Sequence, residues 1–207
     1  MGFFDDMPSA TKGGRNPYFA PDSEFRVEVE SLLWYASKNT KPGKAGNYHF
    51  KLTGVIEETN ATAAQNTDSS RVVATEAGEV AIQLLTFKPD TRTPGSNAQN
   101  PNELPQGDLK HILRVVYDEM VAQGRLDPTS APFPTSGAGF KDMVDAFSAD
   151  DQPASKLTLG LRTNNQPTEK GFFTNHTWFL SDGFVVHPRG APKTKTVAEV
   201  DPDAIPF

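Results

Sequence analysis

The sequence predicts a mainly β protein: five strands closed into a small barrel, a helical insert between the third and fourth strands, and a disordered acidic C-terminal tail. Apolar and polar residues alternate over five segments, which is the pattern of half-buried strands. One segment between the third and fourth of these has apolar residues at helical spacing instead. After Gly183 the 207-residue chain is rich in proline and loses its periodicity, as disordered segments do.

The first two strands are predicted to form a hairpin. Alternation begins at Phe25 and slips by one residue before the Leu32-Leu33-Trp34-Tyr35 run. A β-bulge would explain this slip, and it leaves either Trp34 or Tyr35 on the outer face. The second strand runs from Tyr48 to Ile56, with Tyr48 on the face that points to the core.

The remaining elements follow at intervals along the chain. A third strand covers residues 79–88, and a proline-rich loop covers residues 89–107. A helix is expected from Asp108 to Gly124, and a short second helix is expected near residues 140–147. The last two strands cover residues 156–163 and 172–180.

This order of elements matches the OB-fold, a five-stranded Greek-key barrel that binds oligonucleotides. Other five-stranded barrels, or a sandwich, would produce the same order. The expected organisation is an N-terminal arm over residues 1–24, an OB-fold domain over residues 25–187 and the tail over residues 188–207.

Composition argues against several classes of site. The chain has no cysteine and four scattered histidines, so disulfides, thiol nucleophiles and a Cys/His zinc site are not expected. No phosphate-binding, dinucleotide-binding or nucleophile-elbow motif is present. We expect a protein that is not an enzyme and that needs no cofactor or metal. No apolar run has the length of a membrane span, and the protein reads as cytoplasmic.

Charge is unevenly distributed along the chain. The net charge of −6 is unusual for a nucleic-acid binder, but the segment from Ala36 to Ile56 has four lysines and no acid. Three acids, Glu199, Asp201 and Asp203, lie near the C-terminus without a basic residue beside them. The lysine-rich segment is either a cationic binding surface or a solvated loop.

The ending Asp-Pro-Asp-Ala-Ile-Pro-Phe resembles the C-terminal tip of bacterial single-stranded DNA-binding proteins. The body is more similar to the OB-fold single-stranded DNA-binding proteins of tailed bacteriophages, as in the strand Phe172-Phe173-Thr174-Asn175-His176-Thr177-Trp178-Phe179. In the bacterial family the tip docks on replication and repair proteins. The resemblance implies that partners are bound by Asp201, Asp203, Ile205, Pro206 and Phe207.

A groove for single-stranded DNA needs cations along the phosphates and aromatic faces for the bases. Trp34, His49, Lys51 and Phe87 are expected to share one outer face, bordered by lysines and an arginine in loops. The candidate DNA-binding residues are Trp34, Lys38, Lys41, Lys44, His49, Lys51, Phe87, Lys88, Arg92, Arg162, Phe172 and Trp178.

The expected function is therefore sequence-independent binding of single-stranded DNA in phage replication, recombination or repair, with a tail that recruits partner proteins. The chain would act in the cytoplasm of a bacterial host, as a monomer or a dimer. Two alternatives remain open: an adaptor that binds replication proteins without DNA, and a virion structural protein.

Overall fold

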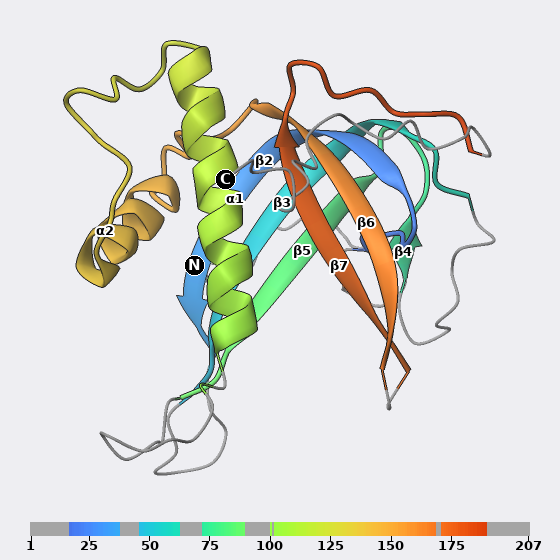
Figure 1. The fold of residues 1–207 in the computed structure, drawn as a ribbon, viewed down its shortest axis with the longest axis horizontal. Coiled ribbons are helices and arrows are strands. Elements are labelled where there is room, and N and C mark those ends of the chain that lie inside the picture. Colours follow the sequence, from blue (N-terminus) through green and yellow to red (C-terminus); the bar gives the residue numbers. More distant parts are fainter. Residues whose placement is uncertain are drawn as a thin grey trace, which may run out of the picture.

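A computed structural model describes residues 17–37, 46–62, 72–89, 100, 102–168 and 171–189. It contains one seven-stranded sheet and two helices (Figure 1). The strands are β1 (Tyr18–Phe19), β2 (Glu24–Ala36), β3 (Tyr48–Thr59), β4 (Val73–Ala74), β5 (Val80–Phe87), β6 (Thr158–Thr168) and β7 (Gly171–Leu180). The helices are α1 (Glu103–Ala122) and α2 (Gly137–Phe147), which lie between β5 and β6 in the chain.

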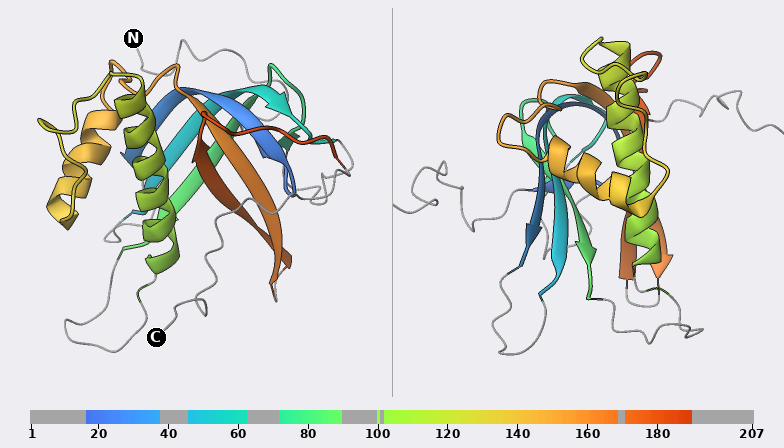
Figure 2. Two further views of the ribbon diagram at one scale, coloured as in Figure 1. Left: turned by 45° about the horizontal axis from the view of Figure 1, so that its top comes forward. Right: turned by 90° about the vertical axis from the view of Figure 1, so that its left-hand side faces the viewer.

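The sheet is mixed and open. Its strand order is β4-β1-β5-β3-β2-β6-β7, so β4 and β7 are its two edges. The five long strands pair antiparallel, whereas β1 runs parallel to both β4 and β5. In Figure 2 the strands β2, β3 and β5 form one wall, β6 and β7 form the other, and α1 stands beside β7.

The predicted closed, five-stranded OB barrel is therefore wrong. Closure would require β7 to pair with β5, but other groups occupy the two edges involved. On β5, the N–H of Ile82 donates to the carbonyl of Pro17 at 2.9 Å, which brings β1 alongside. On β7, the N–H of Trp178 donates to Nε2 of His111 in α1 at 3.1 Å. Both contacts join residues distant in sequence, which explains why alternation alone could not reveal them.

Most of the predicted elements are present. The slip in the first long strand is a bulge at Glu30, because Val29 pairs with Gly54 and Ser31 pairs with Thr53. Helix α1 begins at Glu103, before the predicted start at Asp108. It includes Pro105, which the first turn tolerates because its N–H groups have no intrahelical partner.

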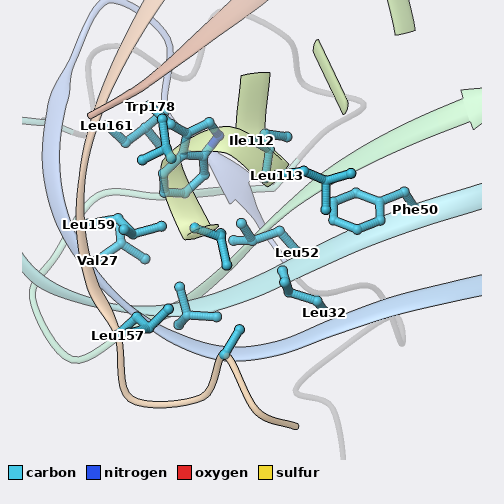
Figure 3. Packing of buried hydrophobic residues seen from close by; sticks show 14 of the residues in the cluster. Val27, Leu32, Phe50, Leu52, Ile112, Leu113, Leu157, Leu159, Leu161 and Trp178 are labelled. Carbon is cyan, nitrogen blue, oxygen red and sulfur yellow. The ribbon is translucent and has the colours of Figure 1, made fainter. Parts of the chain in front are cut away.

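Fully buried side chains from both walls and from α1 form the core (Figure 3). They include Val27, Leu32, Phe50, Leu52, Ile112, Leu113, Leu157, Leu159, Leu161 and Trp178. Burying one such aliphatic side chain contributes about 1.5–3 kcal/mol. Phe19, which lies in the segment predicted to be an arm, is only 1% exposed and belongs to the same core.

The segment after β7 returns across the outside of β6 and β2. Phe184 packs on Gly160, where a Cβ atom would lie 2.3 Å from its ring. Arg26 donates from Nη2 to the carbonyl of Phe184 at 2.7 Å. Arg189 donates to the carbonyl of Asn60 at 3.1 Å. Side chains thus hold the chain as far as Arg189, and the remainder of the predicted tail lies outside the described residues.

Candidate nucleic-acid interface

The sheet separates the four residues that were expected to share one outer face. In the register of β2, β3 and β5, Trp34 lies opposite Phe50 and Phe87 lies opposite Tyr48, on the face that points to the core. His49 and Lys51 lie on the opposite face. The prediction of one common face is wrong for two reasons. Trp34 resumes the inward alternation after the bulge at Glu30. Phe87 lies with Leu85 on the inward face of β5, because these residues pair with Tyr48 and Phe50.

Three aromatic rings form a cluster at the end of the core face. Trp34 and Tyr48 are stacked, with ring centroids 5.7 Å apart and planes 12° apart. Phe87 lies 5.2 Å from Trp34 between ring centroids. Tyr48 is 50% exposed although it was expected in the core, whereas Phe87 is 7% exposed. The cluster therefore presents the Tyr48 ring to solvent and supports it from behind.

The opposite face carries a second ring pair at the same end of the sheet. Tyr35 and His49 are 5.2 Å apart between ring centroids, and Nδ1 of His49 lies 3.1 Å from Oγ1 of Thr86. Tyr35 is 42% exposed. Burial and the nearby Tyr18 raise the pKa of the Tyr35 phenol, so this ring stays neutral near pH 7 and can act as a stacking partner or hydrogen-bond donor.

Both ring groups lie where β2 ends, β3 begins and β5 ends (Figure 1). We call this region the aromatic tip and define it as Trp34, Tyr35, Tyr48, His49 and Phe87. Its surroundings in sequence are cationic, since residues 31–56 contain four lysines and no acid.

Two of the predicted cations can be placed near the aromatic tip. Lys51 lies between Leu33 and Leu84 on the His49 face. Lys88 directly follows β5 and is exposed. Its backbone is held by Asn102, whose Oδ1 accepts from the Lys88 N–H at 2.9 Å and whose Nδ2 donates to the Lys88 carbonyl at 2.9 Å. Lys38, Lys41, Lys44 and Arg92 lie outside the described residues, the first three in the connection between β2 and β3.

Two other predicted residues have structural roles away from the aromatic tip. Arg162 bonds the Glu24 carboxylate through Nε at 2.9 Å and Nη2 at 2.8 Å, and its guanidinium lies over the Phe179 ring at 5.5 Å. Trp178 is 1% exposed, so it could meet a base only by leaving the core. The Arg162 guanidinium is therefore engaged with Glu24, and the Trp178 ring is enclosed in the core. Only the backbone of Phe172 is described, as part of β7.

The Arg162 network also holds the segment that follows β7. Glu24 accepts hydrogen bonds from the backbone N–H and Nδ1 of His187, each at 2.9 Å. Burial alone would raise the pKa of Glu24, but the bonds from His187 and Arg162 hold this pKa below its ordinary value. The ionised carboxylate therefore ties β2, β6 and the last described segment together.

The five partner-binding residues inferred from the C-terminal ending are Asp201, Asp203, Ile205, Pro206 and Phe207. All five lie outside the described residues.

Sequence reasoning missed a second basic and aromatic surface. Lys110, His111 and Arg114 line an open pocket of about 660 Å³ on α1, together with the chain at residues 133–135. A search for cations at helical spacing beside the apolar positions of the predicted helix would have found Lys110 and Arg114. Phe133 could not be found in this way, because it lies in an aperiodic connection.

Among the described residues, no group of three or more histidine or acidic side chains could hold a metal ion. No helix in the same part of the chain has the length and apolarity of a membrane span.

No protein-family model matches the chain, and no curated protein matches it. The candidate interface therefore rests on its own geometry.

Proposed function

We propose that the chain binds single-stranded DNA without sequence preference, through the aromatic tip and the lysines around it. One observation carries this proposal: a half-exposed Tyr48 ring is stacked on Trp34 within a segment, residues 31–56, that has four lysines and no acid. Every base has a flat face that can stack on such a ring, and phosphates require only positive charge, so the combination favours binding that tolerates any sequence.

Each group has a distinct role in the proposed complex. A base stacks on the exposed face of Tyr48, while Trp34 and Phe87 hold that ring in place. The Tyr35–His49 pair offers a second stacking surface on the other side of the hairpin. Lys51, Lys88 and the lysines of the β2–β3 connection neutralise phosphates, and affinity should therefore fall with added salt.

The C-terminal ending supports a second part of the proposal. Its acids and its Ile-Pro-Phe terminus suit a basic, apolar groove on a partner protein, and proline limits the entropy lost on docking. We propose that this ending recruits replication or recombination proteins to DNA held by the tip, in the bacterial cytoplasm during phage infection.

Tryptophan fluorescence can test DNA binding directly. The chain has two tryptophans: Trp34 at the aromatic tip and Trp178 in the core. Titration with oligo-dT should quench the emission, and the logarithm of affinity should fall against log salt with a slope of about −0.7 per phosphate neutralised. Trp34→Phe should retain binding, measured by anisotropy of labelled oligo-dT, but lose most of the quenching.

The alternatives predict different results. An adaptor without a DNA site would leave labelled oligo-dT unbound even at low salt. A virion structural protein would instead assemble into large particles in sedimentation runs. Either result would reject the proposed function. Quenching that persists in Trp34→Phe would place the DNA away from the aromatic tip.

A further inference from the structure

The pocket on α1 has the chemistry of a site for an anionic, flat ligand. Gly107, Lys110, His111 and Arg114 form its helical wall at i, i+3, i+4 and i+7, so they lie on one side of the helix. The opposite wall is the chain at residues 133–135. The pocket thus has a fixed helical side and an aromatic side.

The cations of this pocket are held in place by aromatic rings. The Arg114 guanidinium lies 4.9 Å from the centre of the Phe133 ring and 6.0 Å from that of Tyr117. The Lys110 ammonium lies 5.6 Å from the centre of the Phe140 ring. Cations positioned over rings keep their charge available to an anion while losing freedom of movement, which reduces the entropy cost of binding.

Arg114 is only partly neutralised by its neighbour. Its Nε bonds Oδ2 of Asp118 at 2.7 Å, and this pair is solvent-exposed. Within the part of the chain that the structure describes, the terminal guanidinium nitrogens of Arg114 and the ammonium of Lys110 have no hydrogen-bond partner. The Cα atoms of these two residues lie about 6 Å apart along the helix axis, about one turn of α1, so their side chains can reach two successive anionic groups.

Gly107 is not required by the packing of the fold. A Cβ atom at this position would meet nothing within 4 Å, yet glycine weakens a helix relative to alanine. Glycine is the residue that allows another molecule to approach a backbone closely. Its place in the pocket wall therefore points to a flat group lying against the helix.

The pocket can be reached from the aromatic tip along α1. Asn102, just before the helix, is hydrogen-bonded to the backbone of Lys88, which directly follows β5. Figure 1 shows the start of α1 beside the start of β3 and the end of β5. Leu104 in the first turn is 78% exposed. From Asn102, Lys110 and Arg114 are about 12 Å and 18 Å along the axis. A strand stacked on Tyr48 therefore has a short path to the pocket.

From this geometry we propose that the α1 pocket binds a further part of the same single-stranded DNA. One base lies over Gly107 against Phe133, and Lys110 and Arg114 each neutralise a phosphate. The inference rests on the proposed function, because the aromatic tip supplies the first contact. An acidic peptide is the competing occupant, but nothing connects it to the tip, whereas one continuous strand spans both surfaces.

Oligomer length separates the two contacts. We would measure wild type, Arg114→Gln and Gly107→Phe with labelled dT oligomers of about 4 and about 16 nucleotides, the range of site sizes of single-strand-binding domains. The variants should bind the short oligomer as wild type does and the long oligomer about tenfold more weakly. Arg114→Gln should lower the salt slope by about 0.7 with the long oligomer alone.

Lys141→Gln is the matched control, because it removes an exposed cation that is paired with Asp145 on α2, outside the pocket lining. It should bind both oligomers as wild type does. Thermal melting of each variant separates loss of binding from loss of folding. Since a Cβ at Gly107 meets open space, Gly107→Ala should melt at or above the wild-type temperature, and Gly107→Phe then tests whether filling the pocket blocks the long oligomer.

Three results would overturn the inference. Equal loss with short and long oligomers would mean that the variants act on the aromatic tip. Unchanged binding of both oligomers would reject the pocket while leaving the tip as the DNA site. A labelled peptide of residues 197–207 that binds wild type but not Arg114→Gln, with DNA binding unaffected, would make the pocket a peptide site. If wild type binds neither oligomer, the proposed function itself fails.

Discussion

Trp178 donates a hydrogen bond from Nε1 to Oε1 of Gln83 at 2.6 Å, across the interior of the sheet. Trp178 belongs to β7 and Gln83 to β5, the two strands whose backbones would pair in a closed barrel. Gln83 is 4% exposed and Trp178 is 1% exposed. One buried side-chain bond thus links the two walls at the place where the backbone ladder is missing.

Replacing Gln83 should therefore destabilise the fold. Gln83→Met keeps the volume but leaves the indole N–H buried without its acceptor, which costs about 1–3 kcal/mol. Urea denaturation followed by circular dichroism measures the change, and Gln106→Met, at an exposed position on α1, should stay within about 0.5 kcal/mol of wild type. In a Trp178→Phe background, which lacks the indole N–H, Gln83→Met should destabilise the fold less than it does in wild type. If its cost is the same in both backgrounds, the hydrogen bond is not the cause.

Gly160 should not tolerate a side chain. Its Cβ would lie 2.3 Å from Cγ of Phe184, so Gly160→Ala must displace that ring and should cost about 1–3 kcal/mol. Adding Phe184→Ala should make the alanine at position 160 nearly harmless, because the clashing ring is gone. Gly137→Ala is the control, since a Cβ there meets nothing within 4 Å. Equal melting temperatures for wild type and Gly160→Ala would contradict the packing of the last described segment.

Stability should fall as the pH drops towards 5 because of His176. This side chain lies against Phe19, with ring centroids 6.3 Å apart, and its Nε2 is buried without a partner among the described residues. Burial lowers its pKa to about 4, so the folded protein keeps it neutral while the unfolded chain takes up a proton below its ordinary pKa of about 6.5. His176 therefore contributes fully to the free energy of unfolding above about pH 6.5. This contribution is lost as the pH falls towards the folded-state pKa of about 4.

Between about pH 7 and about pH 5, proton uptake by His176 in the unfolded chain should lower the free energy of unfolding by about 2 kcal/mol. His176→Phe removes the titrating group, so its free energy of unfolding should change less over this interval than that of wild type. Identical pH profiles for wild type and His176→Phe in urea titrations would show that His176 does not titrate as a buried group.

Tyr48 should matter for DNA binding through its ring and not through its hydroxyl. Tyr48→Ala should weaken oligo-dT binding by about 1–3 kcal/mol, the contribution of one stacked base, whereas Tyr48→Phe should bind as wild type does. Anisotropy titrations with labelled oligo-dT measure both. Val72→Ala, at a 63% exposed apolar residue beside β4, controls for the general loss of an exposed apolar side chain. Wild-type affinity in Tyr48→Ala would remove the main stacking site.

The sequence predicted the local elements well and their assembly poorly. Alternation located the five long strands, and the slip after Val29 located the bulge at Glu30, because both depend on neighbours along the chain. The face of Trp34 was mistaken, since a one-residue uncertainty in the position of a bulge reverses every side chain that follows. Tyr48 was assigned to the core from its alternation with Phe50 and Leu52, but it lies at the end of the strand, where the packed interior ends.

By itself the sequence determined the five long strands and the two helices, where one strand bulges, and that lysines gather in one hairpin while acids gather near the C-terminus. It did not locate the short strands β1 and β4, which fall in the predicted arm and in a predicted loop. Tertiary structure alone decided that the sheet stays open, that Arg162 serves the fold, and that the aromatic tip and the α1 pocket exist. The physical reason is the range of the interactions. Periodicity records the environment of a residue among its near neighbours, whereas the Ile82–Pro17, Trp178–His111 and Arg114–Phe133 contacts depend on which distant segments the fold brings together.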